Sequence, residues 1–296
     1  MTASFSEFAR QQARVNGVAI HYATAGSGPP LLLLHGHPQT HWMWHKVAPQ
    51  LARDFTVVAA DLRGYGDSSV PPASESNENY SKRSMATDQV ELMRSLGFKR
   101  FSVLAHDRGA RVAHRMGVDH PEAVERMVLL DIAPTLAMYE QTSEAFARAY
   151  WHWFFLIRPA PLAETLIEAD PEAFLRSVMG SRSAGMQPFT DEAFAEYLRC
   201  ISRPGAATAV CEDYRASAGI DLKHDRADRE AGVRLTCPLL VLWGADGVIE
   251  QCFDPLAEWK KVAASVSGRA LSCGHYLAEE APEELLELLL PFLDGD

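Results

Sequence analysis

The sequence SVLAHDRGAR at residues 102–111 decides the fold. Its apolar run ends in a small-x-Asp-x-Gly turn followed by a helical pattern, the form of a strand-to-helix turn that exposes its central side chain above a sheet. That side chain is Asp107. A carboxylate here can displace a leaving group from saturated carbon and form an alkyl ester. The stretch therefore predicts a nucleophilic aspartate, and the following Arg108 and Arg111 predict a receptor for an anionic substrate.

Short apolar runs elsewhere in the chain predict the rest of the sheet. They lie at 30–36, 56–60, 127–130 and 239–242, separated by longer polar or amphipathic stretches. This alternation predicts an α/β fold, a mostly parallel sheet flanked by crossover helices. Asn16 and Gly17 predict a tight hairpin at one edge. The segments 90–96 and 282–292 have the apolar spacing of amphipathic helices.

The interval 134–231 breaks the alternation of strands and helices. It contains the aromatic stretch YWHWFF at 150–155, acidic and Ala-rich helical stretches, and no convincing buried strand. We expect a helical cap inserted over the sheet, between two parts of one core domain at 1–133 and 232–296. A separate regulatory helical domain is the alternative, but no obvious flexible linker flanks the interval.

Composition limits the classes of partner. The 296 residues, 47% of them hydrophobic and 23% charged, are enough for one large domain with an insertion. A net charge of -11 argues against general binding to nucleic acid or to an acidic membrane surface, since both need a basic field. Any anion site must therefore be made locally. The sequence leaves the oligomeric state open between a monomer and a homodimer.

The cysteines and the N-terminus bear on the cellular compartment. The five cysteines are odd in number and lack a paired short spacing, which favours neither a disulfide framework nor a zinc knuckle. The N-terminus has no basic start followed by an apolar block, and no stretch approaches the roughly 18 apolar residues of a spanning helix. We therefore expect a cytoplasmic protein with reduced thiols.

Three candidate catalytic side chains lie where predicted strands or their loops end. In open α/β sheets the ligand crevice forms at the carboxyl edge of the strands. Asp107 and Asp131 each follow an apolar run, and His275 lies near the C-terminus. We expect His275 to activate water and a carboxylate to orient it. Asp131 is the preferred carboxylate, and Asp246, which also follows an apolar run, is its rival.

Three motifs together resemble the α/β-hydrolase fold branch that contains haloalkane dehalogenases, epoxide hydrolases and haloacetate dehalogenases. They are HGHP at 35–38, DLRGYGDS at 61–68 and HDRG at 106–109. In that branch most haloalkane dehalogenases and epoxide hydrolases place Trp after the nucleophilic Asp. Fluoroacetate dehalogenases instead carry Asp-Arg and a second Arg three residues later, and Arg108 and Arg111 match that pattern. The resemblance spans nearly the whole chain.

The resemblance implies hydrolysis of a short 2-haloacid, such as fluoroacetate, to glycolate and halide. It also implies Asp131 as the triad acid, and His152, Trp153 and Tyr214 as the groups that hold halide. Sequence alone fits an aromatic cap helix buried for packing equally well. His37 departs from the family pattern, which more often has Phe there, and we expect the shape and charge of this pocket wall to differ from those of its relatives.

The expected cycle has two stages. Asp107 attacks the halogen-bearing carbon, and His275 then directs water at the resulting glycolyl ester. Backbone N–H groups of His37 and Arg108 would hold the oxyanion. A substrate carboxylate close to Asp107 is repelled by about several kcal/mol, so the cations of Arg108 and Arg111 must offset it. These steps call for no metal or organic cofactor, and the lone His-x-His at 35–37 is weak evidence for one.

Two other functions compete with this expectation. An epoxide hydrolase would use the same nucleophile with cap tyrosines as acids, and Arg108 speaks against it. The candidate acids are Tyr139, Tyr150, Tyr197 and Tyr214. A non-catalytic receptor for a small carboxylate would keep the scaffold and bind its ligand through the two arginines.

Overall fold

The sheet predicted from the apolar runs is present in the computed structural model, which describes residues 4–295. Eight strands form one sheet in the order β1-β2-β4-β3-β5-β6-β7-β8. The β1–β2 and β2–β4 pairs are antiparallel, and all the others are parallel. The strands are β1 (Ala9–Val15), β2 (Val18–Ala25), β3 (Pro30–Leu34), β4 (Thr56–Ala60), β5 (Phe101–His106), β6 (Val124–Leu130), β7 (Leu239–Gly244) and β8 (Val266–Leu271).

The central strands are continuous apolar runs because helices cover the sheet. Residues 31–34 of β3 and 57–60 of β4 have no exposed surface, as expected for parallel strands buried on both faces. The apolar runs of the sequence do not predict strand β8. It lies at the edge of the sheet, and its residues alternate between half-buried and exposed, so it lacks an apolar run.

The hairpin at the opposite edge confirms its sequence signal. Asn16 and Gly17 join β1 to β2, with φ of 46° and 78°. Two successive residues with positive φ are typical of the turn that matches the twist of a hairpin, and Asn and Gly adopt that conformation most readily.

Helices of the core domain connect the strands. The helix predicted at 90–96 is the last part of α2, which begins earlier because the Ser81 side chain accepts a hydrogen bond from the N–H of Ser84. In the core, α3 packs against β5, β6 and α2. These helices and short 3-10 turns are η1 (Phe5–Glu7), η2 (His41–Trp44), α1 (Ala48–Leu51), η3 (Glu78–Tyr80), α2 (Lys82–Ser95), α3 (Asp107–Asp119), α12 (Val248–Cys252), α13 (Pro255–Val262), α14 (Leu277–Glu280) and α15 (Pro282–Asp294).

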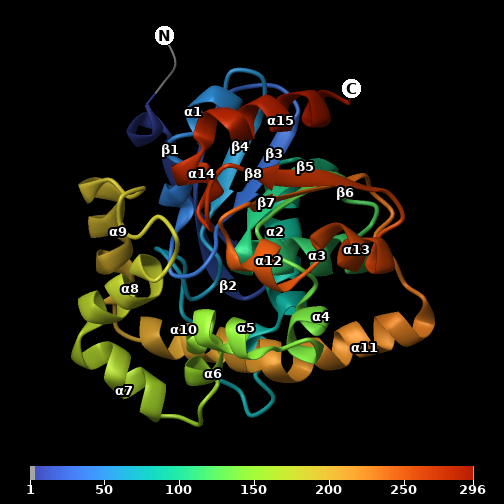
Figure 1. Cartoon of the computed structure of the whole chain (residues 1–296). Coiled ribbons are helices and arrows are strands. Elements are labelled where there is room, and N and C mark those ends of the chain that lie inside the picture. The colour runs from blue at the N-terminus through green and yellow to red at the C-terminus, as the bar shows by residue number, and fades with distance from the viewer. Residues whose placement is uncertain (1–3, 296) are drawn as a thin grey trace.

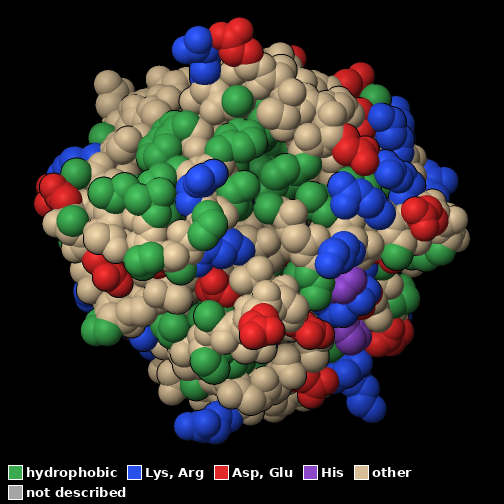
Figure 2. All heavy atoms as spheres, turned by 90° about the horizontal axis from the view of Figure 1, so that it is seen from below, with side chains coloured by type: hydrophobic (Ala, Val, Ile, Leu, Met, Phe, Trp, Pro, Cys, Tyr) green, Lys and Arg blue, Asp and Glu red, His purple; other side chains and the backbone are tan. Residues whose placement is uncertain are grey.

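Between β6 and β7 the chain forms helices only. They gather below the sheet in Figure 1, away from the two chain termini. Seen from below in Figure 2, hydrophobic side chains gather on one part of the surface, with Lys and Arg side chains among them. The elements are α4 (Thr135–Glu140), α5 (Glu144–Ala149), α6 (Trp151–Leu156), α7 (Leu162–Ala169), α8 (Pro171–Gly180), α9 (Asp191–Ile201), α10 (Ala206–Ala216), the π-helical turn η4 (Ser217–Asp221) and α11 (Leu222–Ala231). No helix within residues 4–295 is both long and apolar enough to span a bilayer.

Candidate active site

Asp107 lies at the sharp turn between β5 and α3. Its backbone has a φ of 41°, a left-handed conformation that costs free energy and is concentrated at functional sites. Two glycines make room for the turn. A Cβ on Gly109 would stand 2.5 Å from the carbonyl oxygen of His35, and one on Gly36 would stand 2.7 Å from the Cβ of Asp107. The aspartate is therefore held above the end of the sheet, 3% exposed.

The structure brings Asp131, and not Asp246, into contact with His275. Asp131 follows β6 with a φ of 50°, and its Oδ2 lies 2.5 Å from Nδ1 of His275. Its Oδ1 accepts a hydrogen bond from the N–H of Gly244 at 3.0 Å. Asp246 follows β7 but is exposed. The side-chain contacts therefore select one of the two carboxylates that the sequence left open.

Burial controls the protonation of this pair. It raises the pKa of Asp131 to about 7 and lowers the pKa of His275 to about 3. The imidazole is therefore neutral in the physiological range, the form that can accept a proton. His106 also contacts the loop that carries His275, because its Nε2 lies 2.8 Å from the carbonyl oxygen of His275.

The charge of Asp107 is favoured by its neighbours. Burial alone would raise the pKa of this carboxyl, but His275, Arg111 and Arg108 outweigh burial and hold that pKa well below its usual range. The backbone N–H of His37 adds a hydrogen bond to Oδ2 of Asp107 at 3.1 Å. Asp107 is thus an ionised carboxylate in a nearly dry site, a state suited to nucleophilic attack.

The sequence predicts that the Arg108 guanidinium binds a substrate carboxylate, but in the structure it is mostly occupied by groups of the protein. Its Nε and Nη2 bind the two carboxylate oxygens of Asp213 at 2.9 and 2.8 Å, and Nη2 also contacts the Ser217 hydroxyl at 2.6 Å. Only Nη1 is buried without a partner. The guanidinium lies 4.0 Å above the ring of Tyr214. Arg108 therefore has one donor nitrogen to offer, rather than a two-pronged fork.

Asp213 is a functional candidate that sequence reasoning missed. It is fully buried on α10 and contacts Lys82 as well as Arg108, and it accepts a hydrogen bond from the hydroxyl of Tyr65 at 2.7 Å. It therefore links the cap to the helix that follows the nucleophile. An acidic residue beside Tyr214 in a helix of the cap carries no local signal for this role, because its partners are distant in sequence.

Arg111 is buried without a carboxylate partner among residues 4–295. Its Nη1 binds the Thr135 hydroxyl at 2.9 Å, and its Nε has no partner. The guanidinium lies 4.7 Å from the centroid of the Trp153 ring. Arg111 and Asp107 are four residues apart on α3, so they share one face of the helix. An unpaired buried cation beside the carboxylate is typical of a site that receives an anion.

The aromatic groups expected to hold halide lie together on two of the helices between β6 and β7, α6 and α10. The ring of Tyr214 lies 5.9 Å from that of His152 and 6.3 Å from that of Trp153. The Tyr214 hydroxyl and the Trp153 indole nitrogen are both buried without a hydrogen-bond partner. Both groups are therefore free to donate a hydrogen bond to a small polar ligand within this cluster.

His37 closes this cluster from the core side. Its ring is edge-on to Tyr214 at 5.4 Å and stacked towards His152 at 6.2 Å. Neither ring nitrogen has a partner, and burial lowers the pKa of the imidazole to about 3. The departure from the family's usual Phe therefore adds a neutral hydrogen-bonding group to the pocket wall.

The cap tyrosines occupy different surroundings. The Tyr197 hydroxyl donates to Glu279 at 3.1 Å, so that group is already engaged. The hydroxyl of Tyr139 is buried and unpartnered, and its ring lies 5.1 Å from Trp153. Tyr150 packs 6.4 Å from His275. Three of the four candidates thus surround the site, and Tyr197 has another partner.

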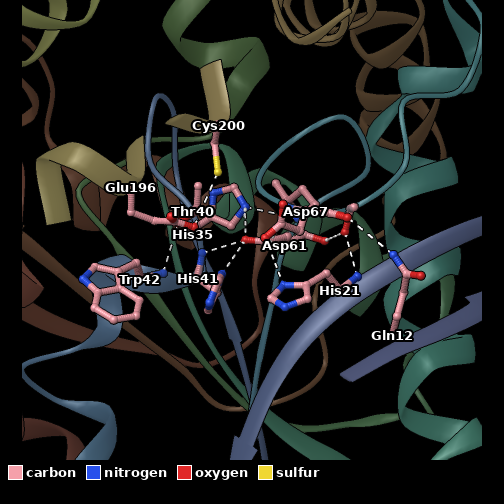
Figure 3. A network of polar contacts seen from close by, with 12 residues as sticks. Gln12, His21, His35, Thr40, His41, Trp42, Asp61, Asp67, Glu196 and Cys200 are labelled. Atoms are coloured by element: carbon pink, nitrogen blue, oxygen red, sulfur yellow. Dashed lines mark hydrogen bonds and ion pairs between the residues drawn. The ribbon is translucent and has the colours of Figure 1, made fainter. Parts of the chain in front are cut away.

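A second buried carboxylate, Asp61, anchors the segment that follows the His-Gly loop. Figure 3 shows His21 and His41 pointing towards it, with Nδ1 distances of 2.8 and 3.0 Å. Backbone N–H groups of His41 and Asp67 donate to the same carboxylate at 2.8 and 3.0 Å. These three side chains have the residue types and spacing of metal ligands. Hydrogen bonds already account for the Nδ1 atoms.

The two histidines of the His-x-His motif do not point at a common centre. His35 Nδ1 lies 2.9 Å from the carbonyl oxygen of Gly36, and its Nε2 accepts from the N–H of Leu62 at 3.1 Å. The His37 ring instead faces the cap aromatics. His35 is therefore a structural bridge between two loops.

Comparison with known proteins agrees with this geometry. The family described as alpha/beta hydrolase fold matches residues 29–282. The chain is 43% identical over 290 residues to a fluoroacetate dehalogenase from Burkholderia sp., covering 98% of this chain and 95% of that protein. It is 36% identical over 295 residues to a soluble epoxide hydrolase from Corynebacterium sp. (strain C12), covering 97% and 98%.

A solved structure extends the likeness to the whole backbone. A protein from Nostoc sp. PCC 7120 is 53% identical and superimposes with a TM-score of 0.96, covering 99% of this chain and all of that one. The sheet, the sharp turn at Asp107 and the family match over residues 29–282 agree on the fold. This chain belongs to the α/β hydrolase fold family.

Proposed function

We propose that this hydrolase releases halide from short 2-haloacids such as fluoroacetate and yields glycolate. The observation that carries the proposal is Arg111, a buried cation beside Asp107 with no carboxylate of its own among residues 4–295. A neutral haloalkane or epoxide gives that charge no partner. A haloacetate brings one, and charge-assisted hydrogen bonds from Arg111 and the free Nη1 of Arg108 would hold it.

In the first stage Asp107 attacks the halogen-bearing carbon. A C–O bond forms, the carbon–halogen bond breaks, and the halide leaves with the electron pair. The indole N–H of Trp153 and the hydroxyl of Tyr214 are free to donate to it. Fluoride needs several directed donors when water is excluded, and the buried cluster would supply them.

In the second stage water attacks the carboxyl carbon of the Asp107 ester. His275 takes a proton from that water, and Asp131 stabilises the imidazolium that forms. The backbone N–H of His37, which now contacts Oδ2, would hold the oxyanion together with the N–H of Arg108. The tetrahedral carboxyl carbon then breaks its bond to the ester oxygen. Glycolate leaves with that oxygen and takes the proton from the His275 imidazolium, and the Asp107 carboxyl, which now holds one oxygen from water, loses its proton and is regenerated as the carboxylate.

Halide release from a small panel tests the function. The panel is fluoroacetate, chloroacetate, a neutral 1-chloroalkane and a neutral epoxide. We expect release from the two haloacetates alone. Turnover confined to the neutral compounds contradicts the role of Arg111.

A single turnover in heavy-oxygen water tests the ester. Because water attacks the carboxyl carbon of Asp107, the label should enter the peptide that contains this residue and not the glycolate. An unlabelled peptide after halide release excludes the covalent route. A His275→Asn variant should stop after the first stage, and the ester should then be visible as a mass increase on the intact protein.

Epoxide hydrolysis is the second candidate, and one observation favours it. The hydroxyls of Tyr214 and Tyr139 are buried without partners, and such groups can protonate an epoxide oxygen. Tyr139→Phe separates the two functions, whereas Tyr214→Phe does not, because the Tyr214 hydroxyl is also a donor to the halide in the proposed reaction. Loss of epoxide opening in Tyr139→Phe with retained dehalogenation of chloroacetate shows that this tyrosine serves a second reaction.

A further inference from the structure

The buried arginines divide into two groups by their partners. Five arginines are buried among residues 4–295. Arg63 pairs with Asp88, Arg108 with Asp213, and Arg115 with three carboxylates on α3 and α11. Arg111 and Arg182 have no carboxylate partner in that part of the chain. A buried charge is costly unless it is paired, so Arg111 and Arg182 are the two buried arginines whose charge a bound anion would offset.

Arg182 has no ion pair among residues 4–295, although Tyr150, Tyr276, Asp107 and Asp131 all favour its charged form and act to raise its pKa. It lies in the turn between α8 and α9, 8% exposed, and its Nε is buried without a partner. Its Nη1 reaches the carbonyl oxygen of Ala149 at 3.5 Å, the weak limit of a hydrogen bond. The guanidinium lies 4.3 Å from the centroid of the Tyr150 ring. These contacts position the cation without neutralising it.

The surroundings of Arg182 belong to the active site. The Tyr150 ring that it covers lies 5.5 Å from His152 and 6.4 Å from His275. The next residue, Ser183, lies against the loop of His275, where a Cβ on Gly274 would stand 2.2 Å from its hydroxyl oxygen. Arg182 therefore joins the cap aromatics to the catalytic loop.

The charge of Arg182 acts on the cluster that would receive halide. Burial, and then Arg182, hold the pKa of His152 well below its usual range. Arg182 also acts to lower the pKa of His37, after burial and Arg108. Both imidazoles therefore stay neutral beside a fixed cation, and the positive charge remains on a group that cannot lose its proton.

The proposed reaction supplies two anions. Before attack, the negative charges are those of Asp107 and the substrate carboxylate. As the C–O bond forms and the carbon–halogen bond breaks, Asp107 becomes a neutral ester and its charge passes to the halide, with no proton transferred. Arg111 is placed for the carboxylate, which leaves one cation for one new anion.

We propose that Arg182 stabilises the departing halide through the His152 and Tyr150 side of the cluster, and so sets the preference among leaving groups. The inference rests on the proposed function. Fluoride concentrates its charge more than bromide does, and a fixed cation in a site with little water therefore favours fluoride release most. Arg182 is thus a specificity-determining residue for the halide.

The test compares Arg182→Met with the wild type in single-turnover halide release from fluoroacetate, chloroacetate and bromoacetate. We expect fluoride release to slow about 100-fold, in the range found when one transition-state donor is removed, and bromide release to slow less than about fivefold. Arg182→Lys should recover most of the fluoride rate. The matched control is Arg176→Met, because Arg176 lies on α8 of the same cap, is exposed and pairs with Glu172.

Equal slowing for all three substrates, or no slowing, overturns the inference, since a merely structural role does not discriminate between halides. A wild type that releases no halide contradicts the proposed function instead. Bromide binding to the free protein, followed by tryptophan fluorescence, is independent of turnover and covers that case. It should weaken about tenfold in Arg182→Met and remain unchanged in Arg176→Met, the difference expected for one charge–anion contact in a partly dry site. Equal bromide affinity in wild type and Arg182→Met overturns the inference.

Discussion

Asp61 and Asp107 are both buried carboxylates at the end of the sheet, but their surroundings differ in one respect. Asp61 receives two imidazoles and two backbone N–H groups, and its carboxylate is saturated with donors. Asp107 receives one backbone N–H, while unpaired donors of Arg111, Trp153 and Tyr214 lie nearby. The carboxylate of Asp61 is satisfied by groups of the protein itself, whereas the surroundings of Asp107 keep donors that a ligand could use.

The same contrast separates two arginines on one helix. Arg108 is tied to Asp213, and Arg111 is not tied to any carboxylate among residues 4–295. The residue type and the helix are the same, so neither predicts which arginine serves the substrate. The partner supplied by the rest of the fold decides it.

The largest expected effect is that of Asp107→Asn. Asparagine keeps the shape and tolerates the positive φ of this turn, but its amide is not a nucleophile. Halide release should fall at least about 10⁴-fold, while thermal unfolding stays near that of the wild type. Halide release within tenfold of the wild type contradicts the assignment of the nucleophile. Ion chromatography of the released halide provides the measurement.

Arg111→Gln should have the next largest effect. Loss of the unpaired cation should lower kcat/KM for chloroacetate by about 10² to 10³, the usual cost of removing one member of a buried charge pair. The control is Arg115→Gln one turn later on α3, where the arginine is paired with protein carboxylates. That variant should lose stability and keep kcat/KM. Equal losses of kcat/KM in both variants would show that charge on this helix acts only through folding.

Asp61→Asn tests the structural role of the other buried carboxylate. The amide cannot accept from all four donors, so the free energy of unfolding should fall by about 3 kcal/mol. The folded protein should keep its kcat within about threefold, because Asp61 contacts no reacting group. Urea unfolding and an assay in the absence of urea give the two quantities. A large fall in kcat with unchanged stability would place Asp61 in the catalytic machinery.

The smallest expected effect is the change in the rate of ester hydrolysis with pH. Burial raises the pKa of Asp131 to about 7 and lowers that of His275 to about 3, so the pair takes up one proton as pH falls through about 7. A protonated Asp131 cannot stabilise the imidazolium that forms on His275, and ester hydrolysis should slow about tenfold per pH unit below this value. Formation of the ester should stay constant, because the pKa of Asp107 lies well below its usual range. Stopped-flow halide release separates the two stages, and an ester-formation rate that follows the same pH curve contradicts the assignment.

Features that are encoded by residues close together in the sequence could be predicted, and features that depend on distant residues could not. The turn at Asp107 is encoded within ten residues by an apolar run, a small residue and Gly109, and the structure has it. Central strands were equally visible as apolar runs. The edge strand β8 was missed because its exposed alternation resembles a loop, and helix α2 was predicted too short because the start depends on a cap at Ser81.

The site was only partly visible for the same reason. Asp131 could be named from its place after a predicted strand and His275 from its place near the C-terminus, and the structure brings Asp131 rather than Asp246 within 2.5 Å of His275. The pairing of Arg108 with Asp213 joins residues 105 positions apart, so it depends on the cap docking against the core. No pattern near Arg182 marks it, because its significance lies in a partner that is absent.

The division of the site between two layers of the fold has a consequence for timing. Asp107 and Arg111 belong to the core, whereas Trp153 and Tyr214 belong to helices inserted between β6 and β7. With Asp107 3% exposed, the proposed reaction requires these layers to separate before a substrate can enter, and the proposed halide donors would then lie apart from the nucleophile. In that reaction access and chemistry would alternate, and each cycle would include one opening and one closing of the same interface.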